Sequence, residues 1–252
     1  MTRPKKKWGQ NFLRNRGAVE KIVAAVEPRP DEVIVEIGPG EGVLTERLAD
    51  YPNDIVAIEI DPDLAANLRS RFGSRVTVLN EDALEAALPT RPFRAVGNLP
   101  YNVATPILRR VITSPNLRRA VFMLQKEVAD RLVARPSTEP YGFLTLFVQL
   151  YANARTLMTL DPGSFHPPPK VRSAVVVLDP DVKPYASEEL IDLISAAFRM
   201  RRKTLVNNLA GWRRRSRATI ELLVASAGFP PTIRAEALPL EAFAKLLDAE
   251  RT

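Results

Sequence analysis

The feature that most constrains the fold is a short apolar run, Val33–Ile37, followed at once by Gly-Pro-Gly-Glu-Gly at residues 38–42. A continuous apolar run that ends at glycines is typical of a strand buried in a parallel sheet. The glycines allow the backbone to turn sharply and to approach a ligand closely. Helical character resumes over Val43–Leu48, so the N-terminus of that helix is expected to face the same ligand. The segment therefore predicts a strand, a ligand-binding loop and a helix.

The alternation of strand and helix continues along the chain. Further strands are expected over Ile55–Ile60, Arg75–Leu79, Phe93–Val96 and Arg119–Leu124. Helices are expected between them, over Asp63–Phe72 and Thr105–Ile112. This spacing predicts an α/β fold with a mostly parallel sheet and helices on both faces.

The pattern changes after residue 140. Tyr141–Tyr151 is long, apolar and aromatic, as in a packing helix, and the β-branched run Val171–Leu178 is expected to pair with the preceding segment as an antiparallel hairpin. A proline-bearing break over residues 180–184 follows. Beyond it, short amphipathic helices are expected over Leu190–Phe198, Ile220–Ala227 and Leu240–Leu247. We therefore expect an α/β domain over residues 1–180 and a small all-α domain over residues 181–252.

The composition of the 252 residues is that of a globular protein, with 46% hydrophobic and 26% charged residues. No apolar run approaches the roughly 18 residues of a membrane span. Cysteine is absent, which excludes disulfides and thiolate metal sites and favours a cytoplasmic location. We expect no metal and no membrane partner.

Basic residues are concentrated in two segments of a chain whose net charge is +7. Residues 1–21 hold seven basic side chains and one acidic one, and residues 199–217 hold eight basic side chains and no acid. Such clustering is typical of proteins that bind polyanions, although solvated basic faces that aid solubility are the simpler alternative. The RNA-binding candidates in the N-terminal arm (residues 1–16) and in the second segment are Lys5, Lys6, Lys7, Arg201, Arg202, Lys203, Arg213, Arg214 and Arg215.

Three acidic residues lie at or near the carboxyl ends of successive expected strands. Glu36 precedes the glycines Gly38 and Gly40, Glu59 is placed to accept hydrogen bonds from ribose hydroxyls, and Asp82 is placed to face an adenine amino group. A sulfonium nucleoside fits such an acidic edge better than NAD, whose fingerprint G-x-G-x-x-G the loop lacks. We therefore expect S-adenosylmethionine (SAM) as the cofactor. The simpler alternative is that the acids only cap helices.

The fourth strand ends in Asn98-Leu99-Pro100-Tyr101. Proline supplies no N–H and restricts the preceding residue to an extended conformation, so the Leu99 carbonyl is expected to be a free acceptor. The Asn98 side-chain oxygen is a second acceptor, and Tyr101 offers a flat face. Two acceptors beside an aromatic ring suit the exocyclic amine of a base. A strand stopped by proline, with a packed tyrosine, is the alternative.

Eight motifs along the chain together resemble the small-subunit ribosomal RNA adenine N6,N6-dimethyltransferases. They are WGQNFL (8–13), EIGPGEGVLT (36–45), EDAL (81–84), NLPYNVATPIL (98–108), LQKEVADRL (124–132), YGFLTLFVQLYA (141–152), FHPPPKVRSAVV (165–176) and FRMRRKTLVNNL (198–209). The resemblance implies a Rossmann-like class I methyltransferase sheet whose last strand is antiparallel, and a small helical C-terminal domain that helps to bind RNA.

The resemblance also implies an activity and its residues. The protein is expected to methylate N6 of adenines in small-subunit ribosomal RNA during ribosome biogenesis, acting as a monomer on a precursor of the small subunit. Phe165 is expected to stack on the target base beside Asn98, Leu99, Pro100 and Tyr101. The positions that the family uses for cofactor contacts are here Asn11, Leu13, Gly38, Glu59, Asp82 and Asn98.

Three positions depart from the family pattern: Arg172 stands where Asp is usual, Asn80-Glu81 replaces a glycine-containing segment, and Trp8 stands where Phe is commoner. None lies within residues 98–101. Two alternatives stay open: a large-subunit rRNA methyltransferase of the macrolide-resistance type, which usually has Ile after the Asn, and an RNA-binding or transcription-associated homologue without activity. An NAD-dependent oxidoreductase is disfavoured by the glycine spacing.

Overall fold

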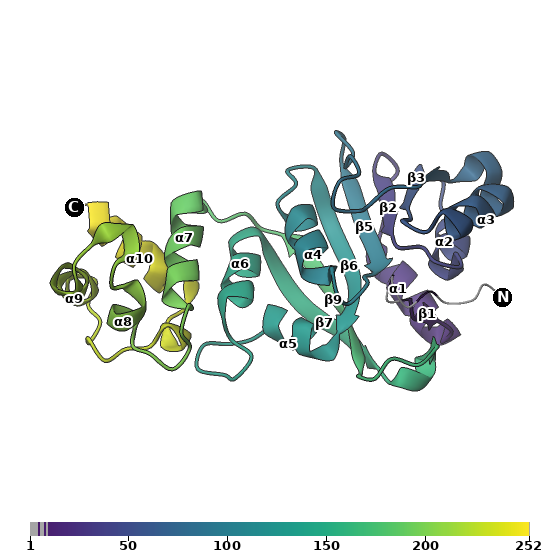
Figure 1. Cartoon of the computed structure of the whole chain (residues 1–252). Coiled ribbons are helices and arrows are strands. Elements are labelled where there is room, and N and C mark those ends of the chain that lie inside the picture. The colour runs from purple at the N-terminus through teal and green to yellow at the C-terminus, as the bar shows by residue number, and fades with distance from the viewer. Residues whose placement is uncertain (1–4, 6–7, 9, 252) are drawn as a thin grey trace. The chain divides into compact units, whose positions relative to one another are not determined.

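The computed structural model describes Lys5, Trp8 and residues 10–251, and it divides into two compact units (Figure 1). Unit 1 comprises the residues up to Ala129 together with Ala154–Pro180. Unit 2 comprises Asp130–Asn153 together with the chain from Asp181 onward. The chain thus passes from one unit to the other within the helix α5 (Lys126–Leu132) and again within the strand β7 (Ala152–Leu160).

The division differs in one respect from the boundary expected at residue 180. That position is a true passage between the units, but residues 130–153 were expected in the first domain and belong to the second. The physical reason is packing: Leu146 and Leu150 of α6 (Phe143–Tyr151) are completely buried in the core of unit 2. An apolar helix can be recognised from its sequence, but the core that receives it cannot.

Unit 1 contains a seven-stranded sheet in the order β4-β3-β2-β5-β6-β9-β7. Five strands run parallel to one another, in the order β4, β3, β2, β5 and β6, and β9 is antiparallel to β6. Besides β7, the strands of this sheet are β2 (Val33–Ile37), β3 (Ile55–Ile58), β4 (Thr77–Leu79), β5 (Phe93–Asn98), β6 (Leu117–Gln125) and β9 (Ser173–Pro180). The mostly parallel sheet with an antiparallel strand is therefore confirmed.

Burial explains why these residues form strands. Every residue of β2 is buried, and successive side chains point to opposite faces, so both faces of the sheet are covered. The helices of unit 1 are α1 (Arg16–Val26), α2 (Val43–Leu48), α3 (Pro62–Phe72), α4 (Ala104–Ile112) and the start of α5. Asp61 caps α3 and Pro62 is its first residue, which is why β3 ends at Ile58 instead of Ile60.

The sequence patterns missed three strands. β7 lies at the edge of the sheet, and residues 153–159 of this strand are exposed or half-buried, so no continuous apolar run marks it in the sequence. β1 (Phe12–Leu13) and β8 (Phe165–His166) form a separate two-stranded antiparallel sheet. This small sheet ties the N-terminal arm to the segment before β9, so two distant motifs lie side by side.

Unit 2 is helical, as expected. Besides α6, its helices are α7 (Glu188–Ala197), α8 (Leu205–Leu209), α9 (Arg217–Ser226) and α10 (Leu240–Arg251). Its core includes Leu190, Ile194, Leu209 and Phe243, each no more than 1% exposed. Of the helices in the described part of the chain, none has the length and apolar character needed to cross a membrane.

Candidate active site

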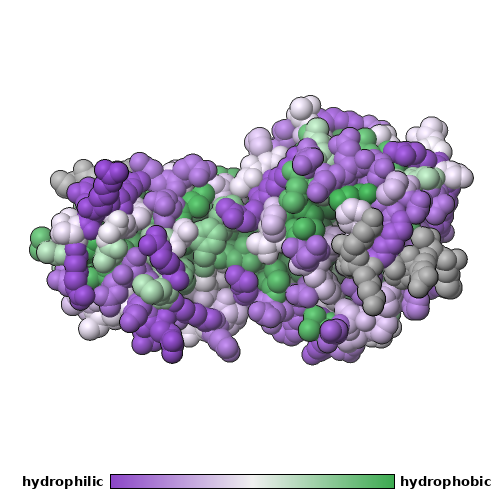
Figure 2. Space-filling model, in the orientation of Figure 1, coloured by the Kyte–Doolittle hydropathy of each residue, from purple (hydrophilic) through white to green (hydrophobic). Residues whose placement is uncertain are grey.

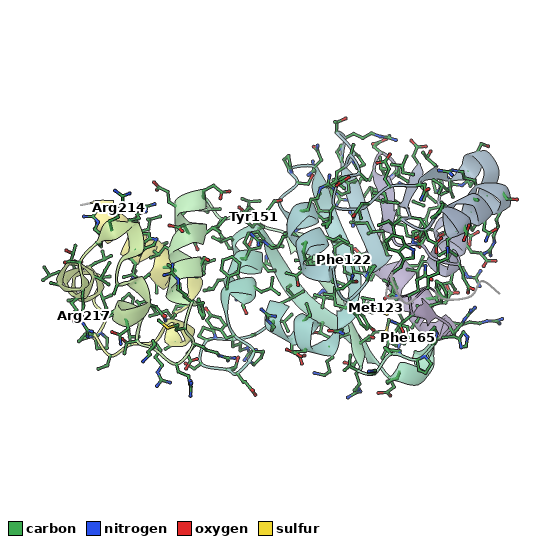
Figure 3. All side chains as sticks on the ribbon, viewed as in Figure 1. Phe122, Met123, Tyr151, Phe165, Arg214 and Arg217 are labelled. Carbon is green, nitrogen blue, oxygen red and sulfur yellow. The ribbon has the colours of Figure 1, made fainter. Side chains whose placement is uncertain are left out.

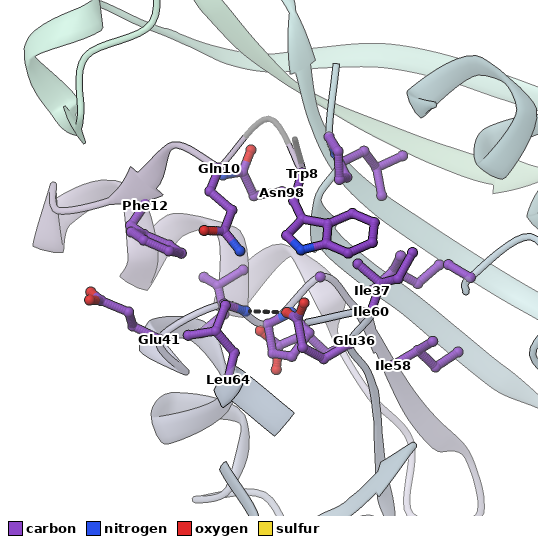
Figure 4. A pocket seen from close by; sticks show the side chains of 18 of the residues that line it. Trp8, Gln10, Phe12, Glu36, Ile37, Glu41, Ile58, Ile60, Leu64 and Asn98 are labelled. Carbon is purple, nitrogen blue, oxygen red and sulfur yellow. Dashed lines mark hydrogen bonds between the residues drawn. The ribbon is translucent and has the colours of Figure 1, made fainter. Parts of the chain in front are cut away.

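A cavity of unit 1 with a volume of about 540 Å³ opens at the carboxyl ends of β2, β3 and β5. This volume lies within the range of small-molecule and cofactor sites. The register explains the site: Ile37 pairs with both Ile58 and Gly97, so three strands end at the same edge. Figure 4 shows Trp8 and Gln10 of the N-terminal arm at this cavity, with Asn98 beside Trp8 and Glu36 on the opposite side of the view.

The cavity brings together all but one of the cofactor and catalytic candidates. The candidates that line it are Asn11, Leu13, Glu36, Gly38, Gly40, Glu59, Asp82, Asn98, Leu99, Pro100 and Tyr101. Phe165 is the exception. Its side chain is only 4% exposed and packs in the core cluster that also contains Met123 (Figure 3). The structure therefore does not present this ring to the cavity.

The glycine loop has the conformation that its sequence predicts. Gly38 and Gly40 have φ values of +67° and +59°, a region that L side chains rarely adopt. At Gly40 a Cβ atom would also lie 3.0 Å from the ring of Phe12. The backbone can therefore pass beneath the arm only because this residue has no side chain.

Glu59 is 5% exposed, and both of its carboxylate oxygens accept main-chain hydrogen bonds. Gly40 donates its N–H to Oε2 at 3.0 Å, and Asp61 donates its N–H to Oε1 at 2.9 Å. Burial raises the pKa of Glu59, while these two N–H donors act in the opposite direction. Each oxygen keeps a second lone pair, so the carboxylate can still accept hydrogen bonds from a ligand.

Glu36 is 1% exposed and accepts a hydrogen bond of 2.6 Å from the hydroxyl of Thr45. Burial, together with the nearby charge of Glu59, raises its pKa to about 7, although the Thr45 hydroxyl opposes the change. Asp82 lies closer to the solvent, and its Oδ1 accepts the Leu84 N–H at 2.9 Å. The wall formed by these acids suits a cation.

Two hydrogen bonds hold the chain where β5 ends. The Asn98 side-chain amide donates a 2.7 Å hydrogen bond to the Asn11 carbonyl. Leu99 donates its N–H to the Met123 carbonyl at 3.1 Å, and Pro100 has no N–H to continue the pairing with β6. Because the Asn98 nitrogen is used by the arm, the amide offers its oxygen as an acceptor.

Tyr101 is anchored through its hydroxyl, which lies 2.7 Å from the hydroxyl of Ser173 at the start of β9. Ser173 is completely buried. Burial raises the pKa of Tyr101, and the Ser173 hydroxyl opposes the change. The ring that lines the cavity therefore has a defined orientation.

Comparison with known proteins supplies the family. The model of the family described as "Ribosomal RNA adenine dimethylase" matches residues 1–225. The chain belongs to this family. A ribosomal RNA small subunit methyltransferase A from Hahella chejuensis is 40% identical over 97% of this chain and 92% of that protein. Its counterpart from Methylococcus capsulatus is 43% identical over 94% of each chain.

Two solved structures agree with the fold. A dimethyladenosine transferase from Plasmodium falciparum has a TM-score of 0.81 and 26% identity, covering 95% of this chain and 98% of that one. The 23S rRNA methyltransferase ErmE has a TM-score of 0.74 and 29% identity, covering 96% and 100%. The α/β sheet with a helical C-terminal region is thus the fold of the dimethylase family.

The basic candidates separate into two groups in this structure. Arg213 and Arg215 form ion pairs with Glu250 at 3.3 and 2.7 Å, and Arg201 lies 3.7 Å from Glu236. Arg202, Lys203 and Arg214 are exposed, in a unit whose surface in Figure 2 carries many hydrophilic side chains. Figure 3 labels Arg214.

Of the three RNA-binding candidates in the arm, the structure describes only Lys5. Lys5 is held by two carboxylates, with its Nζ atom 2.7 Å from Asp61 and 2.6 Å from Asp63. Lys6 and Lys7 lie outside the described residues. Arg172, one of the departures from the family pattern, pairs with Asp161 at 2.9 Å.

Sequence reasoning missed three residues that support the site: Asp61, Ser173 and Thr45. Asp61 lies between the expected strand Ile55–Ile60 and the expected helix Asp63–Phe72 and was not among the site candidates, although a second acid two residues after Glu59 at a strand end was a usable signal. Ser173 and Thr45 carried no such signal, because a single hydroxyl residue is common everywhere. In the part of the chain that the structure describes, no group of three or more His, Cys, Asp or Glu could hold a metal ion.

Proposed function

We propose that this chain transfers methyl groups from SAM to N6 of adenines in small-subunit ribosomal RNA, dimethylating adjacent adenines. The observation that carries the proposal is the orientation of Asn98, whose nitrogen is bound to the Asn11 carbonyl at 2.7 Å. The amide oxygen, the Leu99 carbonyl and the ring of Tyr101 then surround a place for a flat base with an amino group. Membership of the dimethylase family and relatives about 40% identical support the same activity.

The residues of the cavity fit SAM. Glu59 would accept hydrogen bonds from the ribose hydroxyls, and Asp82 would face the adenine amino group of the cofactor. Gly38 and Gly40 leave the backbone open to the ligand, and the charge of Glu36 favours a cationic tail. Asn11 and Leu13 would contact the cofactor from the arm. When bound, SAM supplies an electrophilic methyl group.

The protein's contribution to the reaction is positioning. The lone pair of an adenine N6 is delocalised into the ring, so the amine is a poor nucleophile. Hydrogen bonds from its two hydrogens to the Asn98 oxygen and the Leu99 carbonyl favour a pyramidal nitrogen whose lone pair is available. These bonds become stronger as positive charge develops on N6 in the transition state, which is where they lower the barrier. The methylated nitrogen then loses its proton to water.

Stacking holds the target base. Tyr101 lines the cavity, so we place this ring beside the flipped-out adenine, where stacking contributes roughly 1–3 kcal/mol. The stacking role of Phe165 stays a prediction, because its side chain is buried in this structure. We assign SAM binding and catalysis to unit 1. We assign phosphate contacts with the RNA to Lys6 and Lys7 of the N-terminal arm and to Arg202, Lys203 and Arg214 of unit 2. The protein would act as a monomer in the cytoplasm.

The test is transfer of a labelled methyl group from SAM to purified ribosomal RNA. Unmethylated small ribosomal subunits are expected to accept label at N6 of adenine, and Asn98→Ala is expected to abolish the transfer. Large-subunit RNA serves as the competing substrate. Label only on large-subunit RNA would favour the macrolide-resistance type, and no transfer to either RNA would favour a homologue without activity.

A further inference from the structure

One buried carboxylate holds the N-terminal arm. The Asp61 side chain is 0% exposed, and each of its oxygens is bound by a different residue of the arm. Lys5 Nζ lies 2.7 Å from Oδ1, and the Gln10 side-chain amide donates to Oδ2 at 3.0 Å. Gln10 in turn accepts the Lys5 N–H at 2.7 Å. Lys5 and Gln10 of the arm, five positions apart, therefore form a hydrogen-bonded loop with the Asp61 carboxylate.

The charges of this loop are complementary. Burial raises the pKa of Asp61, but the hydrogen bonds from Lys5 and Gln10 outweigh burial and hold it below its ordinary value. Asp63 adds a second carboxylate 2.6 Å from the Lys5 ammonium. An ammonium has three hydrogens to donate, and two carboxylates already engage this one. Lys5 is therefore committed to the protein, with little left to offer an RNA phosphate.

Asp61 is also hydrogen-bonded to Glu59, a residue that would bind the cofactor. Its main-chain N–H donates to Glu59 Oε1 at 2.9 Å, and Glu59 Oε2 accepts the N–H of Gly40. The arm continues from Gln10 to Asn11, whose carbonyl accepts the Asn98 amide. One side of Asp61 therefore faces the cofactor loop, and the other holds the segment that orients the catalytic amide.

We propose that Asp61 is a positioning residue, which uses Lys5 and Gln10 to hold the N-terminal arm over the cofactor cavity and so sets the orientation of the Asn98 amide. The inference rests on the proposed function. It moves Lys5 from the RNA-binding surface to the cofactor side of the reaction. Loss of the clamp should weaken cofactor binding and lower kcat while leaving the electrostatic part of RNA binding unchanged.

The experiment uses the full chain with Lys5→Met, Lys5→Arg and Asp61→Asn. Lys21→Met, an exposed lysine of α1, is the matched control for loss of one positive charge. Calorimetry with S-adenosylhomocysteine gives cofactor affinity, and RNA binding is measured over a range of salt concentrations. Hydrogen exchange of a peptide covering residues 5–13 reports on the arm without any cofactor. Thermal melting shows which variants are folded.

Lys5→Met is expected to weaken cofactor binding about tenfold or more and to speed hydrogen exchange in the arm. The salt dependence of its RNA binding should equal that of Lys21→Met. Lys5→Arg is expected to restore cofactor affinity and the exchange rate of the arm towards those of the unaltered protein. Both quantities are measured without RNA, so a lost RNA contact would not change them. Asp61→Asn should match Lys5→Met, and the double variant should add little further loss. If Asp61→Asn fails to fold, comparison of Lys5→Met with Lys5→Arg still tests the proposal.

The inference is overturned if Lys5→Met keeps full cofactor affinity and normal arm exchange, or if its main effect is a smaller salt slope for RNA. The two proposals fail separately. Arm exchange is measured without SAM and tests the clamp alone, whereas methyl transfer by the unaltered protein tests the function alone.

Discussion

The side-chain amide of Asn98 donates a hydrogen bond of 2.7 Å to the main-chain carbonyl of Asn11, 87 residues away in the sequence. The bond decides which end of the amide remains as an acceptor. Since the carbonyl of Asn11 can only accept, it must be bound by the NH₂ group. The hydrogen bond joins the arm to the proposed chemistry.

Replacement of Asn98 by Ala removes one of two acceptors for the amine. We expect methyl transfer to fall by at least about 10²-fold, because the remaining carbonyl cannot orient N6 alone. RNA affinity should change little, since the phosphate contacts lie elsewhere. Single-turnover assays and RNA binding measured on the same preparation check this. Near-normal turnover in the variant would contradict the role of the amide.

The raised pKa of Glu36, about 7, predicts that cofactor binding releases a proton near neutral pH. The cationic tail of SAM favours the charged carboxylate, so affinity should rise as the pH increases through 7. About half a proton should leave at pH 7. Calorimetry in buffers of different ionisation enthalpy measures this number, and Glu36→Gln should lose it. An equal release in Glu36→Gln would assign the proton to another group.

Glu36 also makes the stability of the ligand-free protein depend on pH. The pKa of Glu36 in the folded protein, about 7, exceeds the ordinary value of 4.5 for a glutamate, so the folded state binds more protons than the unfolded state over that interval. The free energy of unfolding should therefore fall as the pH rises from about 4.5 to 7, by up to about 3 kcal/mol. Urea denaturation at several pH values, with Glu36→Gln as the control, checks the sign.

The hydrogen bond between Tyr101 and Ser173, 2.7 Å long, predicts matched effects of Tyr101→Phe and Ser173→Ala. Each should raise KM for RNA several-fold, equivalent to about 1 kcal/mol, because the ring loses its anchor. Affinity for S-adenosylhomocysteine should be unchanged. A double-mutant cycle gives the coupling energy, and additive losses would mean that the two hydroxyls act independently.

Exposed and ion-paired basic residues of unit 2 should respond differently to replacement by alanine. Replacing Arg202, Lys203 and Arg214 together should flatten the salt dependence of RNA binding, because each phosphate contact releases counterions. Replacing Arg215 should mainly cost stability, up to about 1 kcal/mol, because it pairs with Glu250. The reverse pattern would place the RNA on the paired arginines.

Replacement of Gly97 by alanine is expected to destabilise the sheet, and replacement of Gly163 by alanine serves as the control. A Cβ atom at this position would lie 2.2 Å from the Ile37 carbonyl oxygen on the neighbouring strand β2. Gly97→Ala must push β2 and β5 apart, at a cost of several kcal/mol. Gly163→Ala, where no atom lies within 4 Å, should be nearly neutral. Equal melting temperatures for the two variants would show that the strands can separate freely.

Much of the fold could be predicted because local patterns agree with the final structure. The apolar runs that became β2, β5 and β6 are buried on both faces, which requires continuous hydrophobicity that is visible in the sequence. β7 was missed because an edge strand needs only one buried face and carries many polar residues. The expected strand ends were off by one or two residues where a helix cap, such as Asp61, competed for the same segment.

The chemistry at the sheet edge can be predicted from the sequence, because glycines that allow positive φ, acids after strands and a proline close after Asn98 act through local geometry. Which of these groups meet depends on the tertiary structure. In the tertiary structure, Phe165 packs in the core, residues 130–153 belong to unit 2, and Lys5 forms an ion pair with Asp61. A side chain's partners depend on contacts between residues far apart in the chain, and no spacing along the sequence encodes those contacts.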